Sequence, residues 1–238
     1  MLGRYLDMEK YKTELHLHTS PASICAHTPP EEMIDQYIEN GYSTVVITNH
    51  MSPALFDLVL PDVRDYRKAA DIYLEDYRRA KRHANGRITV LCGMELRVKQ
   101  NFNDYLIYGI DERFIMDLGN VMDKKIEELY PMFHAHGALV FQAHPFRDCM
   151  TVTNPKYIDG IEAGNFCSTH DSRNDIAALW AKKFNMLTVY GTDYHSTDYM
   201  CSAGILTDSP ICCNFQLIET LKSGKFTVTD GKNIFSPR

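Results

Sequence analysis

The chain has 238 residues, of which 45% are hydrophobic and 24% are charged, a composition that is ordinary for a soluble globular protein with a buried core. The formal net charge of −6 argues against a broad electrostatic contact with nucleic acid, because proteins that bind it usually carry a basic surface. Seven cysteines without repeated spacing, no charged-then-apolar leader and no apolar run of membrane length lead us to expect a cytoplasmic protein with reduced thiols and no membrane partner.

The first predicted strand carries two histidines on one face. In the stretch 14–19, Leu15 and Leu17 alternate with His16 and His18, and this period of two indicates a short, half-buried strand. Residues two apart on a strand point to the same side, so both imidazoles face one way. Two such imidazoles can hold one divalent metal ion, although each could instead be satisfied by a hydrogen bond.

The segments that follow alternate between helices and strands. Pro30 begins a helix that ends at Gly41, and Glu31 and Glu32 lie in its first turn. The β-branched run 43–48 is typical of a strand buried on both faces. We expect a long charged helix over 62–84 next, with its charges forming a solvated face, and then strands over 87–92 and 104–109.

The second half of the chain continues the alternation. We expect helices over 111–118, 120–136, 171–184 and 214–223, and strands over 138–142, 157–162 and 186–190. The strand-then-helix pattern repeats about seven times, and no change of composition marks a linker. Regular alternation of this kind favours parallel strands with helices outside them. The sequence therefore predicts a single, barrel-like α/β domain over residues 1–238.

Polar residues that could carry chemistry follow the predicted strands directly. In closed α/β barrels the loops at the carboxyl ends of the strands converge on one site, so residues far apart in the sequence would meet there. A carboxylate among several histidines can bridge two cations and offset their charge, which suits two or three ions of zinc, manganese or iron. The strand-end residues that predict this multinuclear site are His16, His18, His50, Glu95, His144, Asp193 and His195.

Taken in order, these motifs resemble those of the polymerase and histidinol phosphatase (PHP) family. The chain has His-x-His at 16–18, Gly-x-Glu ending at Glu95, Ala-His-Pro around His144, and Gly-Thr-Asp-x-His at 191–195. The resemblance implies a distorted (β/α)7 barrel of the TIM-barrel kind, a cluster of up to three metals, and phosphoesterase activity. It assigns the seven strand-end residues above as metal ligands.

The chain departs from the family pattern at three places. The loop after His-x-His lacks the common Ser-Asp-Gly, and the resemblance offers His27 as a third-metal ligand, against which stands a plain loop histidine. Asn49 precedes His50 where the family often has aspartate, so a carboxylate that could orient an imidazole is lost. Asp104 stands where a histidine ligand is frequent; it could ligate, or it could cap the strand start.

The reaction that we expect is metal-assisted hydrolysis of a small phosphomonoester such as histidinol phosphate, a nucleotide or a sugar phosphate. Bound cations would give a hydroxide near neutral pH and neutralise the charge that develops on the phosphoryl group. Arg147 is the first candidate for binding the phosphate and Arg97 is the second, although either could be a surface residue in an ion pair. Asp193 and His195 are the catalytic candidates, with His195 or a metal-bound water delivering the proton.

Three other interpretations stay open at this point. A 3′–5′ exonuclease is disfavoured by the acidic balance and by the absence of a polymerase module. An amidohydrolase-type barrel also opens with His-x-His, but it typically bridges its metals with a modified lysine where this chain has Glu95. A non-catalytic metal-binding module is disfavoured by the nearly complete set of ligands. The residues give no indication of the oligomeric state.

Overall fold

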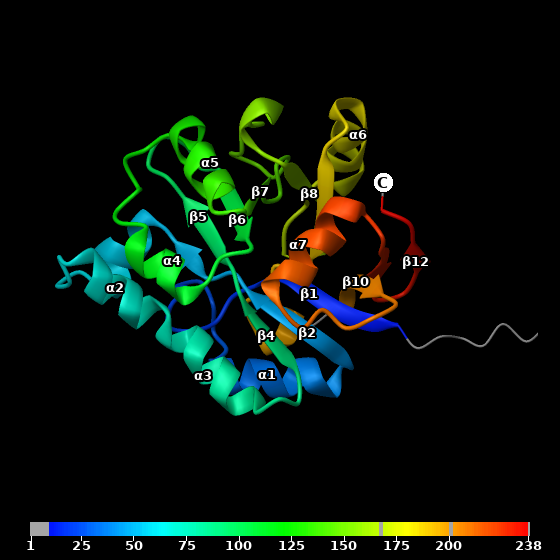
Figure 1. Ribbon diagram of the computed structural model, residues 1–238, viewed down its shortest axis with the longest axis horizontal. Coiled ribbons are helices and arrows are strands. Elements are labelled where there is room, and N and C mark those ends of the chain that lie inside the picture. Colours follow the sequence, from blue (N-terminus) through cyan, green and yellow to red (C-terminus); the bar gives the residue numbers. More distant parts are fainter. Residues whose placement is uncertain (1–9, 167–168, 200–201, 238) are drawn as a thin grey trace, which may run out of the picture.

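The computed structural model describes residues 10–166, 169–199 and 202–237, and its strands form two mixed sheets (Figure 1). Within these residues the first sheet has six strands in the order β12-β11-β10-β1-β2-β4. The strands are β1 (Tyr11–Leu17), β2 (Tyr42–Ile47), β4 (Thr89–Cys92), β10 (Ala203–Thr207), β11 (Thr227–Asp230) and β12 (Ile234–Phe235). β1, β2 and β4 are parallel, whereas β10 to β12 pair antiparallel at one edge.

The second sheet also has six described strands, in the order β3-β5-β6-β7-β8-β9. They are β3 (His50–Met51), β5 (Met94–Arg97), β6 (Asp104–Tyr108), β7 (Leu139–Gln142), β8 (Gly160–Asn165) and β9 (Leu187–Gly191). The expectation of parallel strands throughout is wrong at β6, which runs antiparallel to both of its neighbours. Residues 98–103 between β5 and β6 are too few for the crossover that parallel neighbours require.

The two sheets meet at the carboxyl ends of β1, β2 and β4. β2 is followed at once by β3, and β4 by β5, so the chain passes twice from one sheet into the other. The amide of Gly93, between β4 and β5, donates to the carbonyl of Ile47 at 2.9 Å. At the opposite edge, Leu17 forms a parallel bridge with Tyr194, and the amide of His18 donates to the Tyr194 carbonyl at 2.9 Å. The strand ends that carry the predicted site residues therefore lie together.

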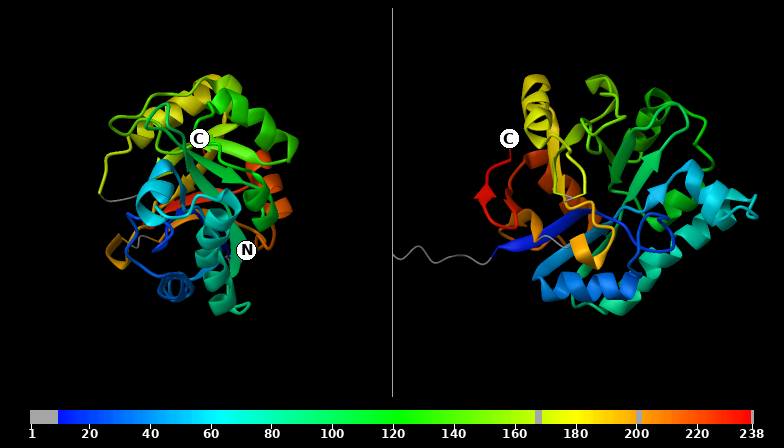
Figure 2. Two further views of the ribbon diagram at one scale, coloured as in Figure 1. Left: turned by 90° about the vertical axis from the view of Figure 1, so that its left-hand side faces the viewer. Right: turned by 180° about the vertical axis from the view of Figure 1, so that it is seen from behind.

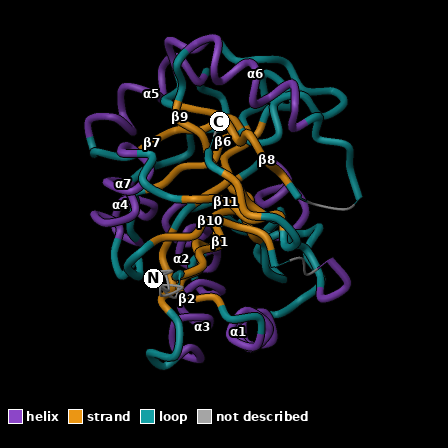
Figure 3. Tube along the Cα trace, turned by 90° about the vertical axis from the view of Figure 1, so that its right-hand side faces the viewer, coloured by secondary structure: helices purple, strands orange, loops and turns teal. Residues whose placement is uncertain are grey.

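Helices flank the strands on two sides. α1 (Pro30–Glu39) and α3 (Glu75–Ala84) lie beside β2 and β4, while α5 (Ile126–Ala135) and α6 (Asn174–Phe184) lie at the other end of the molecule beside β7 and β8 (Figures 1 and 3). Figure 2 shows the same arrangement from behind, with β1 running from the edge toward the middle. The described helices are α1 (Pro30–Glu39), α2 (Tyr66–Tyr73), α3 (Glu75–Ala84), α4 (Glu112–Asp117), α5 (Ile126–Ala135), α6 (Asn174–Phe184) and α7 (Asn214–Ser223), with short helical turns at Leu55–Val59, Pro155–Tyr157 and Thr197–Tyr199.

Two expected helices differ from the observed ones at their starts. The helix predicted over 62–84 begins only at Tyr66, because the Asp65 side chain accepts from the amide of Lys68 and caps α2 there. It is then divided at Leu74 into α2 and α3. The helix predicted over 120–136 begins at Ile126, where the Glu128 carboxylate accepts from the Lys125 amide. Among the described residues, no helix combines the length and the apolar character that crossing a membrane requires.

β1 is buried on both faces, so the expectation of a half-buried strand is wrong. Leu15, Leu17, His16 and His18 are all fully inaccessible to solvent. The leucine side packs in the hydrophobic core, as a strand inside an α/β fold requires. The histidine side is buried as well because polar side chains from other strand ends cover it.

Close packing against β1 depends on a glycine at the end of β9. A Cβ atom added to Gly191 would lie 2.5 Å from the Cβ of His16, closer than real contacts allow. We expect Gly191→Ala to lower the free energy of unfolding by about 1–3 kcal/mol through overpacking. Because His16 is displaced, we also expect weaker binding of a divalent metal, with zinc as the probe, at the site that the sequence predicts.

Gly41→Ala is the matched control for this prediction. Gly41 has a φ of +73°, and a Cβ atom added there would have no neighbour within 4 Å, so the cost is only the left-handed backbone, about 1 kcal/mol, with zinc binding unchanged. Urea unfolding and zinc titration measure both effects. Equal zinc affinities in the two variants would contradict the proposed contact with His16.

Candidate metal centre and active site

The carboxylate of Glu95, on β5, is the centre of the candidate site. It is fully buried, and four ring nitrogens surround it. Its Oε1 lies 3.2 Å from His16 Nε2 and 3.3 Å from His144 Nε2, and its Oε2 lies 2.8 Å from His50 Nδ1 and 3.3 Å from His18 Nε2. Neither oxygen has a partner with hydrogen-bond geometry among the described residues. An ionised carboxylate that is buried without hydrogen-bond donors indicates bound cations, because an uncompensated buried charge costs much free energy.

The tautomer of His16 is set by a second buried carboxylate. Glu162, on β8, is fully buried, and its Oε1 lies 2.8 Å from His16 Nδ1. Because a carboxylate only accepts, Nδ1 carries a proton, so Nε2 is the atom of this ring that is left to ligate a cation beside Glu95. The other oxygen of Glu162 accepts from the His144 amide at 2.9 Å and from the Asn165 side chain at 3.0 Å.

The tautomer of His18 is set through a serine that sequence reasoning missed. The Ser23 hydroxyl donates to Asn49 Oδ1 at 3.0 Å and accepts from the His50 amide at 2.9 Å. It therefore accepts from His18 Nδ1, 3.1 Å away, and leaves Nε2 of His18 as a lone pair in the site. Asn49 thus orients an imidazole through Ser23, in place of the carboxylate that many family members have.

The pKa values of the buried groups shift in opposite directions. Burial disfavours a charge on His16, but the surrounding carboxylates, Asp193 foremost, raise its pKa well above the usual value. Burial and the nearby His50 lower the pKa of His18 well below the usual value. Burial alone would raise the pKa of Glu95, whereas the histidines around it hold the pKa well below the ordinary range. Without a bound cation, these directions favour a protonated His16 and a neutral His18 beside ionised Glu95. A metal requires deprotonated ligands, so a cation bound here would take the place of the His16 proton that faces Glu95.

Asp193 closes the site from the end of β9. Its Oδ1 lies 3.3 Å from His16 Nε2 and 3.4 Å from His18 Nε2, and its Oδ2 accepts from Arg147 Nη2 at 2.6 Å. The backbone φ is +51° at Asp193 and +28° at His144, conformations that are uncommon for residues other than glycine. Such strain clusters at functional sites, and here it occurs at two of the predicted ligands.

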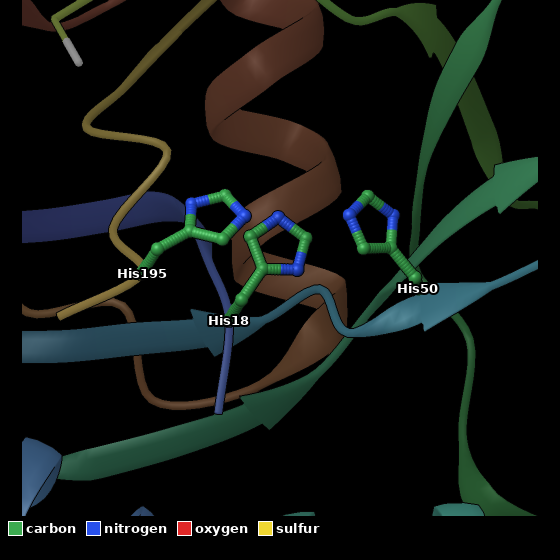
Figure 4. A group of neighbouring side chains, drawn as sticks. All are labelled: His18, His50 and His195. Carbon is green, nitrogen blue, oxygen red and sulfur yellow. The ribbon is translucent and has the colours of Figure 1, made fainter. Parts of the chain in front are cut away.

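His18, His50 and His195 form a second part of the centre. One ring nitrogen from each lies within 4.8 Å of the others. Figure 4 shows His18 between the other two rings, with centroids 4.4 Å from His50 and 4.4 Å from His195. The described residues contain three further groups that could hold a metal ion: His16-His18-Glu95, His16-His144-Asp193 and His50-Glu95-Asp104.

Asp104 reaches the centre but is already paired. It opens β6 directly opposite Arg97 in the antiparallel register, and Arg97 donates to both of its carboxylate oxygens, with Nε 2.7 Å from Oδ1. Its Oδ2 lies 3.9 Å from His144 Nε2. Arg97 is thus the ion-pair partner of Asp104, and its guanidinium is less free for a phosphate than the sequence implied.

A cavity of about 730 Å³ opens over these residues. His27 lies on its wall with an exposed side chain, and its amide donates to the His195 carbonyl at 2.8 Å. No metal-binding group in the described part of the chain includes His27. Cys25 lies closer to the centre, with Sγ 3.1 Å from His195 Nε2. Burial raises the pKa of this thiol, but hydrogen bonds from His195 and His50 outweigh burial and lower the pKa to about 6.

The comparisons with known proteins place the chain in a family. Residues 14–204 match the PHP domain model, so the chain belongs to the PHP domain family and the resemblance inferred from the motifs is confirmed. No curated protein matches the sequence.

Several solved structures share the fold at low identity. One is a two-domain protein from Bacteroides vulgatus that contains a predicted PHP-like metal-dependent phosphoesterase (TM-score 0.65, 16% identity); the match covers 93% of this chain and 65% of that one. Another is PsfC from Pseudomonas syringae, with a TM-score of 0.64 and 15% identity; the match covers 89% of this chain and 88% of that one. A third is an amidohydrolase from Chromobacterium violaceum with bound sulfate and no metal. Its TM-score is 0.54 at 15% identity, and the match covers 95% of this chain and 98% of that one. This chain thus spans slightly less than two thirds of the Bacteroides protein.

The carboxyl of Glu14 ties β1 to the segment after β9, and sequence reasoning missed it. Its Oε1 accepts from the amides of Leu15, His16 and Thr192 at 2.8–3.0 Å, and Tyr37 donates to Oε2 at 3.3 Å. The spacing in the sequence could have revealed it, because Glu14 lies two residues before His16 and so shares the same face of the strand. Burial disfavours the charged form, and the hydrogen bonds offset only part of this, so the pKa is raised to about 7.

This raised pKa predicts a pH-dependent stability. As pH rises from 4.5 toward 7, the unfolded chain releases the Glu14 proton while the folded chain keeps it, so folding stability falls by about 3 kcal/mol and then levels off. Glu14→Gln keeps the accepting oxygen and removes this titration. Urea unfolding in EDTA between pH 5 and 8 should show the free energy of unfolding of wild type falling relative to that of Glu14→Gln. Parallel plots of this free energy against pH would refute the raised pKa of Glu14. Glu219→Gln, at an exposed position, is the control.

Glu95 should control metal content. We expect Glu95→Gln, which cannot supply the buried negative charge, to hold at least one divalent ion fewer per chain than wild type by elemental analysis after zinc or manganese loading and desalting. Glu219→Gln, on the exposed face of α7, should match wild type. Equal metal content in Glu95→Gln and wild type would show that this carboxylate is not a ligand.

Proposed function

We propose that this protein is a cytoplasmic metal-dependent phosphoesterase that hydrolyses a small phosphomonoester, such as histidinol phosphate, a nucleotide or a sugar phosphate. The observation that carries the proposal is the buried Glu95 carboxylate, whose oxygens face four histidine nitrogens beneath a cavity of about 730 Å³. Two or three ions of zinc, manganese or iron would be held by the nitrogen and oxygen donors that converge there. The proposed ligands are His16, His18, His50, Glu95, His144, Asp193 and His195, with Asp104 at the margin.

Divalent ions bound in this centre would polarise phosphoryl oxygens and lower the pKa of water to about 7. The chain's own contribution begins with Arg147. Its Nη2 pairs with Asp193, while its Nε is buried without a hydrogen-bond partner among the described residues. A guanidinium held in this way at the cavity wall can donate to the oxygens of a phosphate monoester.

The catalytic roles proposed for Asp193 and His195 follow from their contacts. Asp193 holds Arg147 in place with one oxygen and turns the other toward His16 and His18. His195 Nδ1 lies 2.7 Å from the backbone carbonyl of Asp193 and so carries a proton, which leaves Nε2 to face the cavity. His195 would deliver a proton to the leaving alkoxide only with Nε2 protonated and unligated, and solvent would deliver it when Nε2 ligates a metal.

We also infer that the two sheets act together as a distorted seven-stranded barrel. Support comes from the two strands that continue from one sheet into the other and from the Leu17–Tyr194 bridge. The Tyr108 hydroxyl on β6 donates to the Leu15 carbonyl on β1 at 2.8 Å, which joins the two sheets through the interior.

The similarity to the Chromobacterium amidohydrolase supports an amidohydrolase interpretation, but that similarity concerns the fold alone. A modified lysine is typical of that class, and no lysine is among the described residues that line the cavity. Hydrolysis of nucleic acid is disfavoured by the net charge of −6.

A substrate panel tests the proposed function. Purified protein loaded with manganese or zinc would be offered histidinol phosphate, sugar phosphates, nucleotides, an aryl phosphodiester, a short oligonucleotide and an N-acyl amino acid. We expect phosphate release from one or more monoesters, reduced roughly 100-fold or more in Glu95→Gln and unchanged in Glu219→Gln. Turnover of only the oligonucleotide or the amide, or of nothing, would overturn the proposal.

Arg147 should act on substrate rather than on metal. Arg147→Lys keeps the charge but loses the planar fork, and we expect kcat/KM for the best monoester to fall roughly 10- to 100-fold, the cost of one or two charged hydrogen bonds. Metal content should stay at the wild-type value. Arg113→Ala, which removes a guanidinium that is 90% exposed, is the control. A loss of metal together with activity would mean that Arg147 only supports Asp193.

A further inference from the structure

Cys25 occupies a position that the proposed reaction does not use. It lies in the loop between β1 and α1, on the wall of the cavity, with Sγ 3.1 Å from Nε2 of His195. His50 is the second hydrogen-bonding neighbour of the thiol. A sulfur atom therefore sits beside two of the three imidazoles drawn in Figure 4.

The nitrogen atoms next to this sulfur are placed to ligate a cation. His195 Nδ1 donates to the Asp193 carbonyl, so Nε2 is the ring nitrogen that shares one proton with the Cys25 thiol and becomes free when that proton leaves. His18 Nδ1 donates to Ser23, so its Nε2 is free of a proton. These deprotonated nitrogens are the atoms with which imidazoles ligate a cation.

A second observation also points to a cation in this part of the centre. Glu95 Oε2 is fully buried and has no hydrogen-bond donor among the described residues. It lies 3.3 Å from His18 Nε2 and 2.8 Å from His50 Nδ1, on the buried side of the same histidines. The thiol of Cys25 lines the cavity with its Sγ 3.1 Å from His195 Nε2, so a sulfur donor borders the group at His195.

The loop that carries Cys25 is held firmly at both ends. Before it, Asp76 Oδ2 accepts from the Thr19 hydroxyl and the Ala22 amide, both at 3.0 Å. After it, the Ala26 amide donates to the Ser23 carbonyl at 3.0 Å, and the backbone of residue 27 is tied to His195. The loop thereby fixes the thiol beside His195 and leaves the His27 side chain exposed.

We propose that Cys25 is a thiolate ligand which, with His18, His50 and His195, makes one position of the metal centre selective for zinc. A thiolate among imidazoles is a donor set that zinc favours, with four ligands in tetrahedral arrangement, over the harder manganese ion. Binding replaces the thiol proton, which passes to solvent, and no oxidation is involved. His195 is then a ligand, and solvent protonates the leaving group. The inference rests on the proposed metal binding but not on the phosphoester reaction.

Cobalt spectroscopy tests the ligand directly. Metal-free protein titrated with Co²⁺ should develop the near-ultraviolet absorption of thiolate-to-cobalt charge transfer. The band should be absent from Cys25→Ser and present in Cys212→Ser, which replaces an exposed cysteine elsewhere. Zinc affinity should fall at least roughly 10-fold in Cys25→Ser, a loss that even an outer partner of a ligand can cause.

Alkylation of the wild-type protein gives a second readout that needs no variant. Zinc should slow the reaction of Cys25 with iodoacetamide, measured by peptide mass spectrometry, while Cys212 in the same chain reacts at an unchanged rate. Bound cobalt without the thiolate band, or equal alkylation of Cys25 with and without zinc, would overturn this inference and leave the proposed phosphoesterase intact. Failure to bind either metal at all would overturn both.

Discussion

The Glu95 carboxylate is fully buried, and its oxygens lie 2.8 to 3.3 Å from the ring nitrogens of four histidines. Two other carboxylates at the centre have guanidinium partners, since Asp104 pairs with Arg97 and Asp193 with Arg147. Among the described residues, no arginine or lysine pairs with Glu95. Imidazole lone pairs do not compensate a negative charge in a low-dielectric interior, whereas divalent cations do. The convergence of strand ends from both sheets on this one carboxylate is therefore best explained by bound metal.

The precision of the centre depends on residues that do not reach the cavity. Glu162 fixes the proton of His16, and Ser23 fixes the proton of His18, so both Nε2 atoms face inward. Gly191 lets the end of β9 approach β1 closely enough for Asp193 to reach the same point. These contacts join β1 and its following loop to other parts of the chain, with Ser23 doing so through Asn49. The candidate metal ligands can thus be positioned by the fold before any ion arrives, which lowers the cost of binding.

Much of this arrangement could be predicted from the sequence because its signals are local. Strand-end positions identified the seven strand-end residues from His16 to His195, since parallel strands deliver their carboxyl ends to one side. The antiparallel direction of β6 could not be predicted from periodicity, because parallel and antiparallel strands share a period of two. Only the short connection over residues 98–103 indicated it. Arg97 looked free to bind phosphate for the same reason: its pairing with Asp104 exists only in the antiparallel register. The loop of His27 has no periodicity at all, so its contacts depended on backbone hydrogen bonds that sequence does not display.

The two halves of the centre differ in the hardness of their donors, and this has a consequence for the metals. Toward Arg147 the donors are Glu95 Oε1, the Asp193 carboxylate and imidazoles, a set that accepts manganese, iron or zinc. Toward Cys25 the donors are three imidazoles beside Glu95 Oε2, and the proposed thiolate would make that set favour zinc. Given the proposed ligands, one uniform metal would therefore be a poor match for both halves. With the proposed ligands, a mixed centre with zinc beside Cys25 and a harder ion beneath Arg147 would satisfy both donor sets.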